Sequence, residues 1–196
     1  MKIYDCFSYL DEDLLLNLRL KILDNYVDYF VIVEGTKTWQ NNTKKLNFDI
    51  KKFKKFEKKI IYVVVEDTLD SVKKAHIGQN SLVERHQRNS ILRGLKNSHD
   101  NDLIIISDVD EIPDLNKLNL FDKEKRYAVF LQKKFDYKLN LLNETEGDWY
   151  GSKICLKKNL KSPQWLRDLK FKKYPFWRID KIRDLQIIKD GGWHFS

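Results

Sequence analysis

The amino-acid sequence predicts an α/β fold with a mostly parallel central sheet and helices on both faces. Continuous apolar runs recur along the first two-thirds of the chain, amphipathic segments separate them, and this alternation is lost after Pro113. An apolar run bounded by turn residues is typical of a strand that is buried on both faces. Strands that alternate with helices in this way form a parallel sheet, because each crossover helix returns the chain to the same end of the sheet.

Each element of the first part follows from a local pattern. Apolar runs, some ending in an acidic residue, predict strands at residues 2–9, 28–34, 60–65 and 102–107. Apolar residues at helical spacing predict helices that begin at residues 11–13 and that span residues 50–59 and 81–97. The second of these helices is short and strongly basic, with its apolar residues facing inward.

The last third is less regular. We expect strands at residues 127–131 and 154–156, a short helix at 162–169, and an extended segment at 182–188 that leads into the terminal 191–196. We interpret residues 1–196 as a single domain, with halves at 1–113 and 114–196. The chain stops directly after a motif-like segment, which suggests a truncated C terminus.

Composition and charge restrict the class of protein. The formal net charge is +8, and much of the excess lies in the basic run at residues 51–59. Such a run can bind nucleic acid, anionic lipid or a phosphorylated substrate, or it can be a solvated helix face. Two isolated cysteines make neither a disulfide framework nor a zinc cluster. Without a signal peptide or a membrane-spanning stretch, we expect a cytoplasmic protein, soluble or peripheral at the inner face of a membrane.

Acidic residues gather where the predicted strands end. Asp5 lies on the first strand, Glu34 ends the second, residues 66–67 follow the third, and Asp108, Asp110 and Glu111 follow the fourth. The carboxyl ends of parallel strands meet at one edge of the sheet, where ligands bind. Clustered carboxylates repel one another. The sequence therefore predicts a cation or a set of hydrogen-bond donors among them.

Asp108 and Asp110 form the sharpest pattern. In an extended segment these two side chains point to the same side, and Val109 points away. Two carboxylates on one side make a hard oxygen site for Mn²⁺ or Mg²⁺ that leaves positions open for substrate phosphates. The alternative is an acidic turn that leads into Pro113.

Two further segments contribute candidate ligands. Arg85, Arg88 and Asn89 share one face of the predicted helix before the fourth strand, and arginine is suited to phosphate contact. Arg85 can equally belong to an exposed charged face. His194 follows two glycines and a tryptophan and is a candidate third metal ligand, although a lone histidine near a terminus is more often structural.

Several segments together resemble glycosyltransferase family 17. They are KIYDCFSYLDEDLLLNLRL, VDYFVIVEG, HQRNSILRGL, the DLIIISDVDEIP block at residues 102–113, and GGWHFS. The family includes the β-1,4-mannosyl-glycoprotein β-1,4-N-acetylglucosaminyltransferase. The resemblance spans nearly the whole chain, and these segments together are more specific than an Asp-x-Asp alone.

The resemblance implies a GT-A type, Rossmann-like fold with an N-terminal nucleotide-sugar half and a smaller acceptor-side half. It also implies a nucleotide-sugar donor (UDP-GlcNAc for the known animal activity), a glycan acceptor, a divalent metal, Mn²⁺ or Mg²⁺, and inversion at the anomeric carbon. The metal ligands would be Asp108, Asp110 and His194. Residues expected at the nucleotide sugar are Asp5, Glu34, Arg88, Asn89, Ser107 and Asp108.

An inverting enzyme also needs a carboxylate that deprotonates the acceptor hydroxyl. The candidates are Asp168, Asp148 and Glu111, each of which could instead be a surface acid. Tryptophans at 149, 165 and 193 could stack on sugar faces or pack in the core.

Parts of the sequence also fit two other classes of function. A phosphotransferase of the haloacid-dehalogenase type also places Asp-x-Asp after a buried strand, although its motif continues differently. A basic nucleic-acid-binding module would use the run at residues 51–59, but it leaves the acidic strand ends unexplained.

Overall fold

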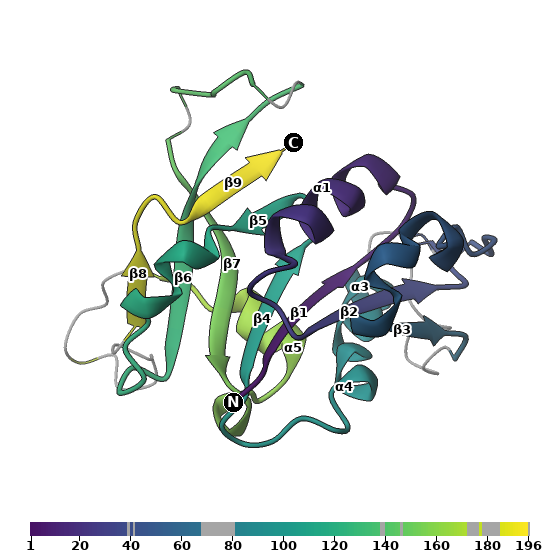
Figure 1. Cartoon of the computed structure of the whole chain (residues 1–196), viewed down its shortest axis with the longest axis horizontal. Helices are drawn as coiled ribbons and strands as arrows, with labels where there is room; N and C mark the ends of the chain where they lie inside the picture. Colours follow the sequence, from purple (N-terminus) through teal and green to yellow (C-terminus); the bar gives the residue numbers. More distant parts are fainter. Residues whose placement is uncertain are drawn as a thin grey trace.

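One mixed sheet runs through the molecule in this computed structural model (Figure 1). The structure describes residues 1–38, 40, 42–67, 81–137, 140–145, 147–171, 177 and 185–195. Within these residues the sheet has nine strands in the order β3-β2-β1-β4-β7-β6-β9-β5, and β8 pairs with β6. The predicted α/β class is confirmed.

The N-terminal half of the sheet is parallel. Its strands are β1 (Ile3–Ser8), β2 (Tyr29–Gly35), β3 (Ile60–Val65) and β4 (Leu103–Asp108). All three neighbouring pairs among them are parallel, so their carboxyl ends meet at one edge. Each strand lies within one or two residues of its predicted range, because a continuous apolar run leaves little choice of position.

The C-terminal half of the sheet is mixed. It contains β5 (Glu111–Pro113), β6 (Tyr127–Phe135), β7 (Trp149–Leu156), β8 (Leu185–Ile188) and β9 (Gly192–Phe195). Strand β7 is antiparallel to both β4 and β6, and β9 is parallel to β6 but antiparallel to β5. "Mostly parallel" therefore holds only for the first half. Residues 182–184 of the predicted extended segment lie outside the described residues.

Helices connect the strands, and local residues explain where several of them begin. They are α1 (Asp13–Leu23), η1 (Ile50–Lys59), α3 (Ser81–Asn89), α4 (Ile91–Gly94), η2 (Leu115–Leu120), η3 (Lys157–Asn159) and α5 (Pro163–Asp168). Ser162 caps α5 by accepting a hydrogen bond from the backbone of Trp165, and Pro163 suits the first turn. The single helix predicted at 81–97 is instead two short helices.

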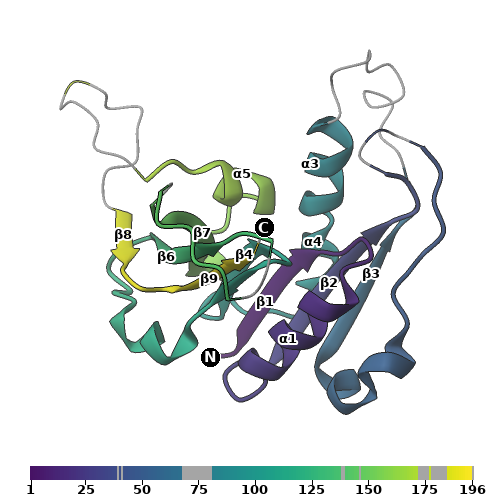
Figure 2. The ribbon, with the colours of Figure 1, turned by 90° about the horizontal axis from the view of Figure 1, so that it is seen from above.

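Helices cover both faces of the sheet, as predicted (Figure 2). On one face, Leu16 and Leu20 of α1 and Phe53 and Phe56 of η1 pack into one buried cluster. On the other face, Ile91 of α4 and residues of α5 pack into a second cluster. Both cysteines are buried and free, so they pack as small core residues.

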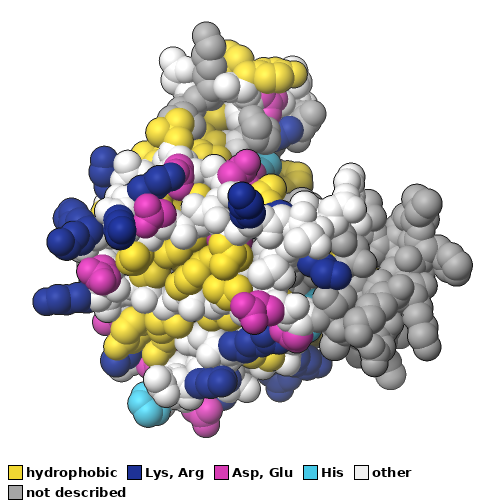
Figure 3. All heavy atoms as spheres, turned by 90° about the vertical axis from the view of Figure 1, so that its right-hand side faces the viewer, with side chains coloured by type: hydrophobic (Ala, Val, Ile, Leu, Met, Phe, Trp, Pro, Cys, Tyr) yellow, Lys and Arg dark blue, Asp and Glu magenta, His cyan; other side chains and the backbone are white. Residues whose placement is uncertain are grey.

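The basic run forms η1 on the molecular surface. Phe53 and Phe56 are buried, whereas most of its lysines are exposed. Lys52 pairs with Asp13, and Lys55 and Lys59 pair with Asp24. Figure 3, which views the molecule from the side of β3, shows Lys and Arg side chains around an area of apolar side chains. Among the described residues, no helix is both long and apolar enough to cross a membrane.

Candidate functional site

A cavity of about 360 Å³ opens at the carboxyl ends of β1, β2 and β4. Ser8 and Gly35 at the ends of β1 and β2, Gln87 of α3, and the turn at residues 108–110 line it. Gln87 packs so closely over Gly35 that a Cβ at Gly35 would lie 2.2 Å from its Nε2. Gln87 also donates to the carbonyl of Lys37 at 2.7 Å, which fixes the cavity wall. The parallel topology thus places the predicted acidic turn at the mouth of a cavity.

A buried arginine, Arg19, binds the backbone of that turn. Arg19 of α1 pairs with Asp5 and donates to Ser107 Oγ at 2.8 Å. Its Nη1 donates to the backbone carbonyls of Asp108 at 3.1 Å and Glu111 at 2.6 Å. One side chain therefore ties the end of β4 to the start of β5.

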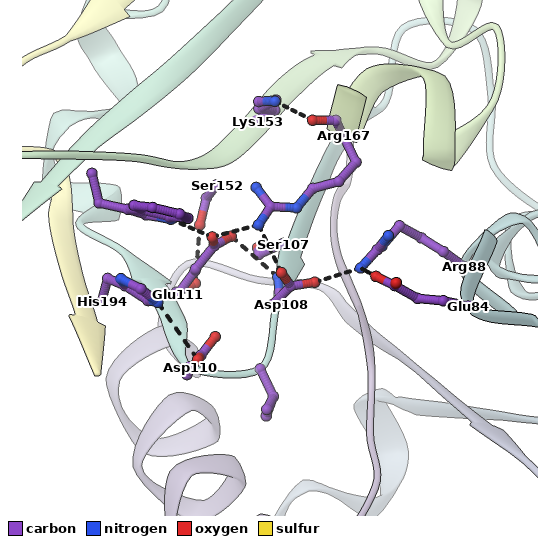
Figure 4. A network of polar contacts seen from close by, with 12 residues as sticks. Glu84, Arg88, Ser107, Asp108, Asp110, Glu111, Ser152, Lys153, Arg167 and His194 are labelled. Atoms are coloured by element: carbon purple, nitrogen blue, oxygen red, sulfur yellow. Dashed lines mark hydrogen bonds and ion pairs between the residues drawn. The ribbon is translucent and has the colours of Figure 1, made fainter. Parts of the chain in front are cut away.

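Two arginines hold the carboxylate of Asp108 (Figure 4). Arg88 Nη2 donates to Oδ1 at 2.8 Å, and Arg167 Nη2 donates to Oδ2 at 2.7 Å. Burial raises the pKa of Asp108, but the charges and hydrogen bonds of Arg167 and Arg88 outweigh it and hold the pKa below its usual value. Asp108 is therefore an ionised, paired carboxylate.

Glu111 lies behind the turn and is almost fully buried, with 1% of its surface exposed. Its Oε1 accepts from Trp149 Nε1 at 2.6 Å and from Arg167 Nη2 at 2.7 Å. Its Oε2 accepts from the backbone of Asp108 at 3.2 Å. Burial raises the pKa of Glu111 above its usual value. Glu111 therefore links the turn to β7 and α5.

Asp110 and His194 face each other across the turn (Figure 4). The antiparallel register of β5 and β9 places His194 opposite Glu111, and the backbone of Phe195 donates to the carbonyl of Asp110. His194 Nε2 then lies 3.6 Å from Asp110 Oδ2. Asp110 Oδ1 and His194 Nδ1 are buried atoms without a hydrogen-bond partner within the described residues. Buried polar atoms of this kind need a partner, such as an ion or a ligand.

The sequence model of glycosyltransferase family 17 matches residues 1–152, well over half of the chain. The chain belongs to glycosyltransferase family 17. It is therefore a glycosyltransferase, and it uses a sugar donor and an acceptor. The matched range includes the Asp108–Asp110 turn and Trp149, whereas α5 and β9 follow it.

Other comparisons are weaker. Among curated proteins, no sequence matches this glycosyltransferase. HddC from Yersinia pseudotuberculosis is similar in structure with a TM-score of 0.48 at 11% identity, over 97% of this chain and 92% of that chain. A Bacillus anthracis protein, provisionally assigned as a glucose-1-phosphate thymidylyltransferase and bound to sucrose, has a TM-score of 0.42 at 11% identity, over 97% and 87% of the two chains.

The expected metal ligands of this glycosyltransferase are Asp108, Asp110 and His194. No group of three or more His, Cys, Asp or Glu side chains that could hold a metal occurs in the described ranges. Asp108 is turned toward two arginines, so Asp110 and His194 remain as a pair with unpartnered atoms. Mg²⁺ and Mn²⁺ prefer oxygen ligands, and Mg²⁺ commonly takes one or two protein carboxylates and completes its shell with phosphates and water. A two-ligand site that is completed by substrate fits this donor set.

Several residues expected at the nucleotide sugar have structural partners. Asp5 and Ser107 have no exposed surface and contact Arg19. Glu34 is also fully buried. It accepts hydrogen bonds from Lys44, from Tyr62 at 2.8 Å and from the backbone of residues 47 and 48. Glu34 thereby fixes the backbone at residues 47 and 48. Direct contacts of these residues with a nucleotide stay predictions.

The Arg88–Asn89 pair connects the two halves of the enzyme. Arg88 Nη1 donates to Gln164 Oε1 at 2.7 Å, and Asn89 Oδ1 accepts from the backbone of Gln164 at 3.0 Å. Both residues therefore hold the first turn of α5. This helix in turn carries Arg167 to Asp108.

The three candidate bases lie in different surroundings. Glu111 is buried, as described above. Asp168 is exposed and accepts from Arg85 at 3.1 Å and from Gln164 at 2.9 Å. Asp148 is exposed and directly precedes β7.

Sequence reasoning missed three residues of the site: Arg19, Lys153 and Arg167. Arg19 follows Leu16 by three residues, so its place on the buried face of α1 was readable from helical spacing. Lys153 donates to the carbonyls of Arg167 and Leu169 at the end of α5, and burial lowers its pKa to about 8. The contacts of Lys153 and Arg167 depend on how α5 packs, which no local pattern reveals.

Proposed function

We propose that this glycosyltransferase transfers a sugar, with GlcNAc from UDP-GlcNAc as the best candidate donor, to a hydroxyl of a glycan. The proposed reaction proceeds with inversion and depends on Mn²⁺ or Mg²⁺. The observation that carries the proposal is the pair of unpartnered buried atoms, Asp110 Oδ1 and His194 Nδ1, at a turn that borders a 360 Å³ cavity.

The cavity is suited to the nucleoside part of the donor. Tyr9, Leu10 and Leu15 provide apolar lining, whereas Thr38, Gln40 and Gln87 provide hydrogen-bonding groups. A mostly apolar cavity with a few polar groups is typical of a site for a planar, polar-edged ligand. Lys37 lies in the same lining and supplies positive charge for a diphosphate, whereas Lys44, also in the lining, pairs with Glu34.

Asp110 and His194 would hold the metal ion, and the ion would neutralise charge on the leaving diphosphate. Arg88 and Arg167 keep Asp108 ionised and fixed, so the turn has one orientation. Arg19 holds the backbone of that turn from the opposite side. Preorganised groups of this kind lower the barrier because they need no rearrangement in the transition state.

An acceptor hydroxyl must lose its proton as it attacks the sugar. Among the three candidate bases, Glu111 lies beside Asp108, and its raised pKa is the direction that suits a general base near neutral pH. Asp148 and Asp168 are exposed and lie on the acceptor-side half. Glu111→Gln, Asp148→Asn and Asp168→Asn distinguish them, because loss of the base lowers kcat by roughly 10²–10⁴-fold while donor affinity persists.

The experiment that tests the donor assignment is a thermal-shift screen of nucleotides and nucleotide sugars with Mn²⁺, with Mg²⁺ and with chelator. A stabilisation by one nucleoside diphosphate and its sugars, present only with metal, would support the proposal and name the base. A folded protein that none of the compounds stabilises would contradict it.

The exposed lysines of η1 support a setting at the cytoplasmic face of a membrane. Clustered lysines bind anionic lipid at low salt. Flotation with phosphatidylserine vesicles should capture the protein, and vesicles of neutral lipid should not.

A further inference from the structure

Trp149 is fixed by the protein on one edge and one face. It begins β7, and its Nε1 donates to Glu111 Oε1 at 2.6 Å. Its ring stacks on His194 with centroids 4.7 Å apart and planes 20° apart. Even so, 40% of the residue is exposed. The indole is therefore rigid, and part of it meets solvent.

The structure separates Trp149 from the other tryptophans that the sequence offered as sugar platforms. Trp165 packs on Tyr127 with centroids 5.1 Å apart, and Lys161 lies over its ring at 4.7 Å. Trp193 packs against the main hydrophobic cluster. Both have an evident packing role, whereas the exposed part of Trp149 has none.

A glycine keeps space beside the indole. A Cβ at Gly151 would lie 1.7 Å from Gln132 Oε1 and 3.2 Å from Trp149 Cδ1. Any larger residue there would push Gln132 or the indole out of place. Gly151 of β7 therefore helps to keep the exposed ring in its position.

Trp149 lies next to the proposed reaction centre but outside the cavity. The cavity is lined by Asp108 and Asp110 from one side of the turn, and Trp149 is not part of its lining. Trp149 instead contacts Glu111 and His194, on strands of the C-terminal half. A group bound on the indole would therefore approach the turn from outside the nucleoside cavity.

We propose that the exposed part of Trp149 is the platform of the acceptor subsite, and that it receives a β-linked pyranose ring. In such a sugar the axial C–H groups form an apolar face that can lie on an aromatic ring, while the hydroxyls stay hydrated at its rim. Burial of this face against a rigid indole is favourable and costs little conformational entropy. The inference rests on the proposed transfer to a glycan hydroxyl.

The test measures binding of simple sugars separately from binding of nucleotide. The probes are methyl β-D-glucopyranoside and methyl N-acetyl-β-D-glucosaminide. Saturation-transfer NMR gives the affinity of each, and calorimetry with UDP and Mn²⁺ gives the nucleotide affinity. The variants are Trp149→Ala and Trp149→Phe. Tyr26→Ala is the matched control, since it removes a ring of similar exposure (37%) just before β2, at the other end of the strands.

The platform predicts that Trp149→Ala weakens both β-glycosides about tenfold, that Trp149→Phe weakens them less, and that Tyr26→Ala has no effect. Undiminished glycoside binding in Trp149→Ala would overturn the inference, as would a wild type that binds UDP but neither β-glycoside. Trp149-dependent glycoside binding in a protein that binds no nucleotide would overturn the proposed donor and leave the platform standing.

Discussion

Arg19 donates to both carboxylate oxygens of Asp5, from Nε at 2.7 Å and from Nη2 at 2.6 Å, and neither side chain is exposed to solvent. The same guanidinium donates to the carbonyls at both ends of the Asp108–Glu111 turn. An ion pair in the core thus holds the backbone from which the proposed metal ligand Asp110 projects.

Arg19→Met should destabilise the fold by about 3–5 kcal/mol, because it leaves the Asp5 charge buried and unpaired. Arg93→Met is the matched control. Arg93 also forms a two-bond pair, with Asp67, but both partners are substantially exposed, so its loss should cost less than about 1 kcal/mol. Urea denaturation measures both free energies of unfolding. Equal losses in the two variants would show that the buried pair has no special role.

Arg167→Met should make stability depend on pH in a window that begins at the ordinary pKa of a glutamate, 4.5. Without the guanidinium, the part-exposed Asp108 and the buried Glu111 face each other as like charges, so the already raised pKa of Glu111 rises further. The folded state then binds a proton that the unfolded state has released, and stability falls as pH rises through this window. Arg85→Met, which breaks only the exposed pair with Asp168, should leave the pH profile unchanged. A flat difference between Arg167→Met and wild type would contradict the assigned contacts.

Lys153 should give wild-type stability the opposite slope at higher pH. Its pKa lies near 8 in the fold, against a usual value of 10.5. Between these values the unfolded state holds a proton that the folded state has lost, so stability rises with pH, by about 3 kcal/mol in all. Lys153→Met should lack this rise, whereas the exposed Lys96→Met should keep it. The measurement is chemical denaturation from pH 7 to 10.5, and an unchanged slope in Lys153→Met would refute the prediction.

Gly192→Ala should detach β9 from β5. Gly192 has a φ of 126°, and a Cβ there would lie 2.2 Å from the carbonyl oxygen of Ile112. We expect a loss of about 2–4 kcal/mol together with displacement of His194, which lies two residues later. Gly147→Ala separates strain from collision, because Gly147 also has a positive φ (72°) but no atom within 4 Å of its Cβ position. Similar losses in both variants would assign the effect to backbone strain alone.

The features that the sequence predicted correctly depend on residues that are close together in the chain. The apolar runs placed β1 to β4 within two residues, and the Asp-x-Asp pattern located the turn, because both depend on local sequence. Strand β5 is only three residues long, and it exists because β9 pairs with it from about 80 positions further along the chain. No local pattern predicts that pairing.

The roles of the strand-end carboxylates also depend on contacts that no local pattern predicts. All of them were expected at one edge, and Asp108 and Asp110 do lie at the cavity. Asp5 and Glu34, however, are buried and contact Arg19 and Lys44. Only the packing of α1 and of the chain after β2 distinguishes a carboxylate at the cavity from one in the core.

We propose that Asp110, with His194, holds a divalent metal needed for donor binding. Calorimetric titration of UDP-GlcNAc with Mn²⁺ and with chelator tests it most directly, in wild type, Asp110→Asn and the exposed control Asp122→Asn. We expect metal-dependent binding in wild type and in Asp122→Asn. Asp110→Asn should abolish it, while its melting temperature stays near that of wild type. Undiminished, metal-dependent affinity in Asp110→Asn would contradict it.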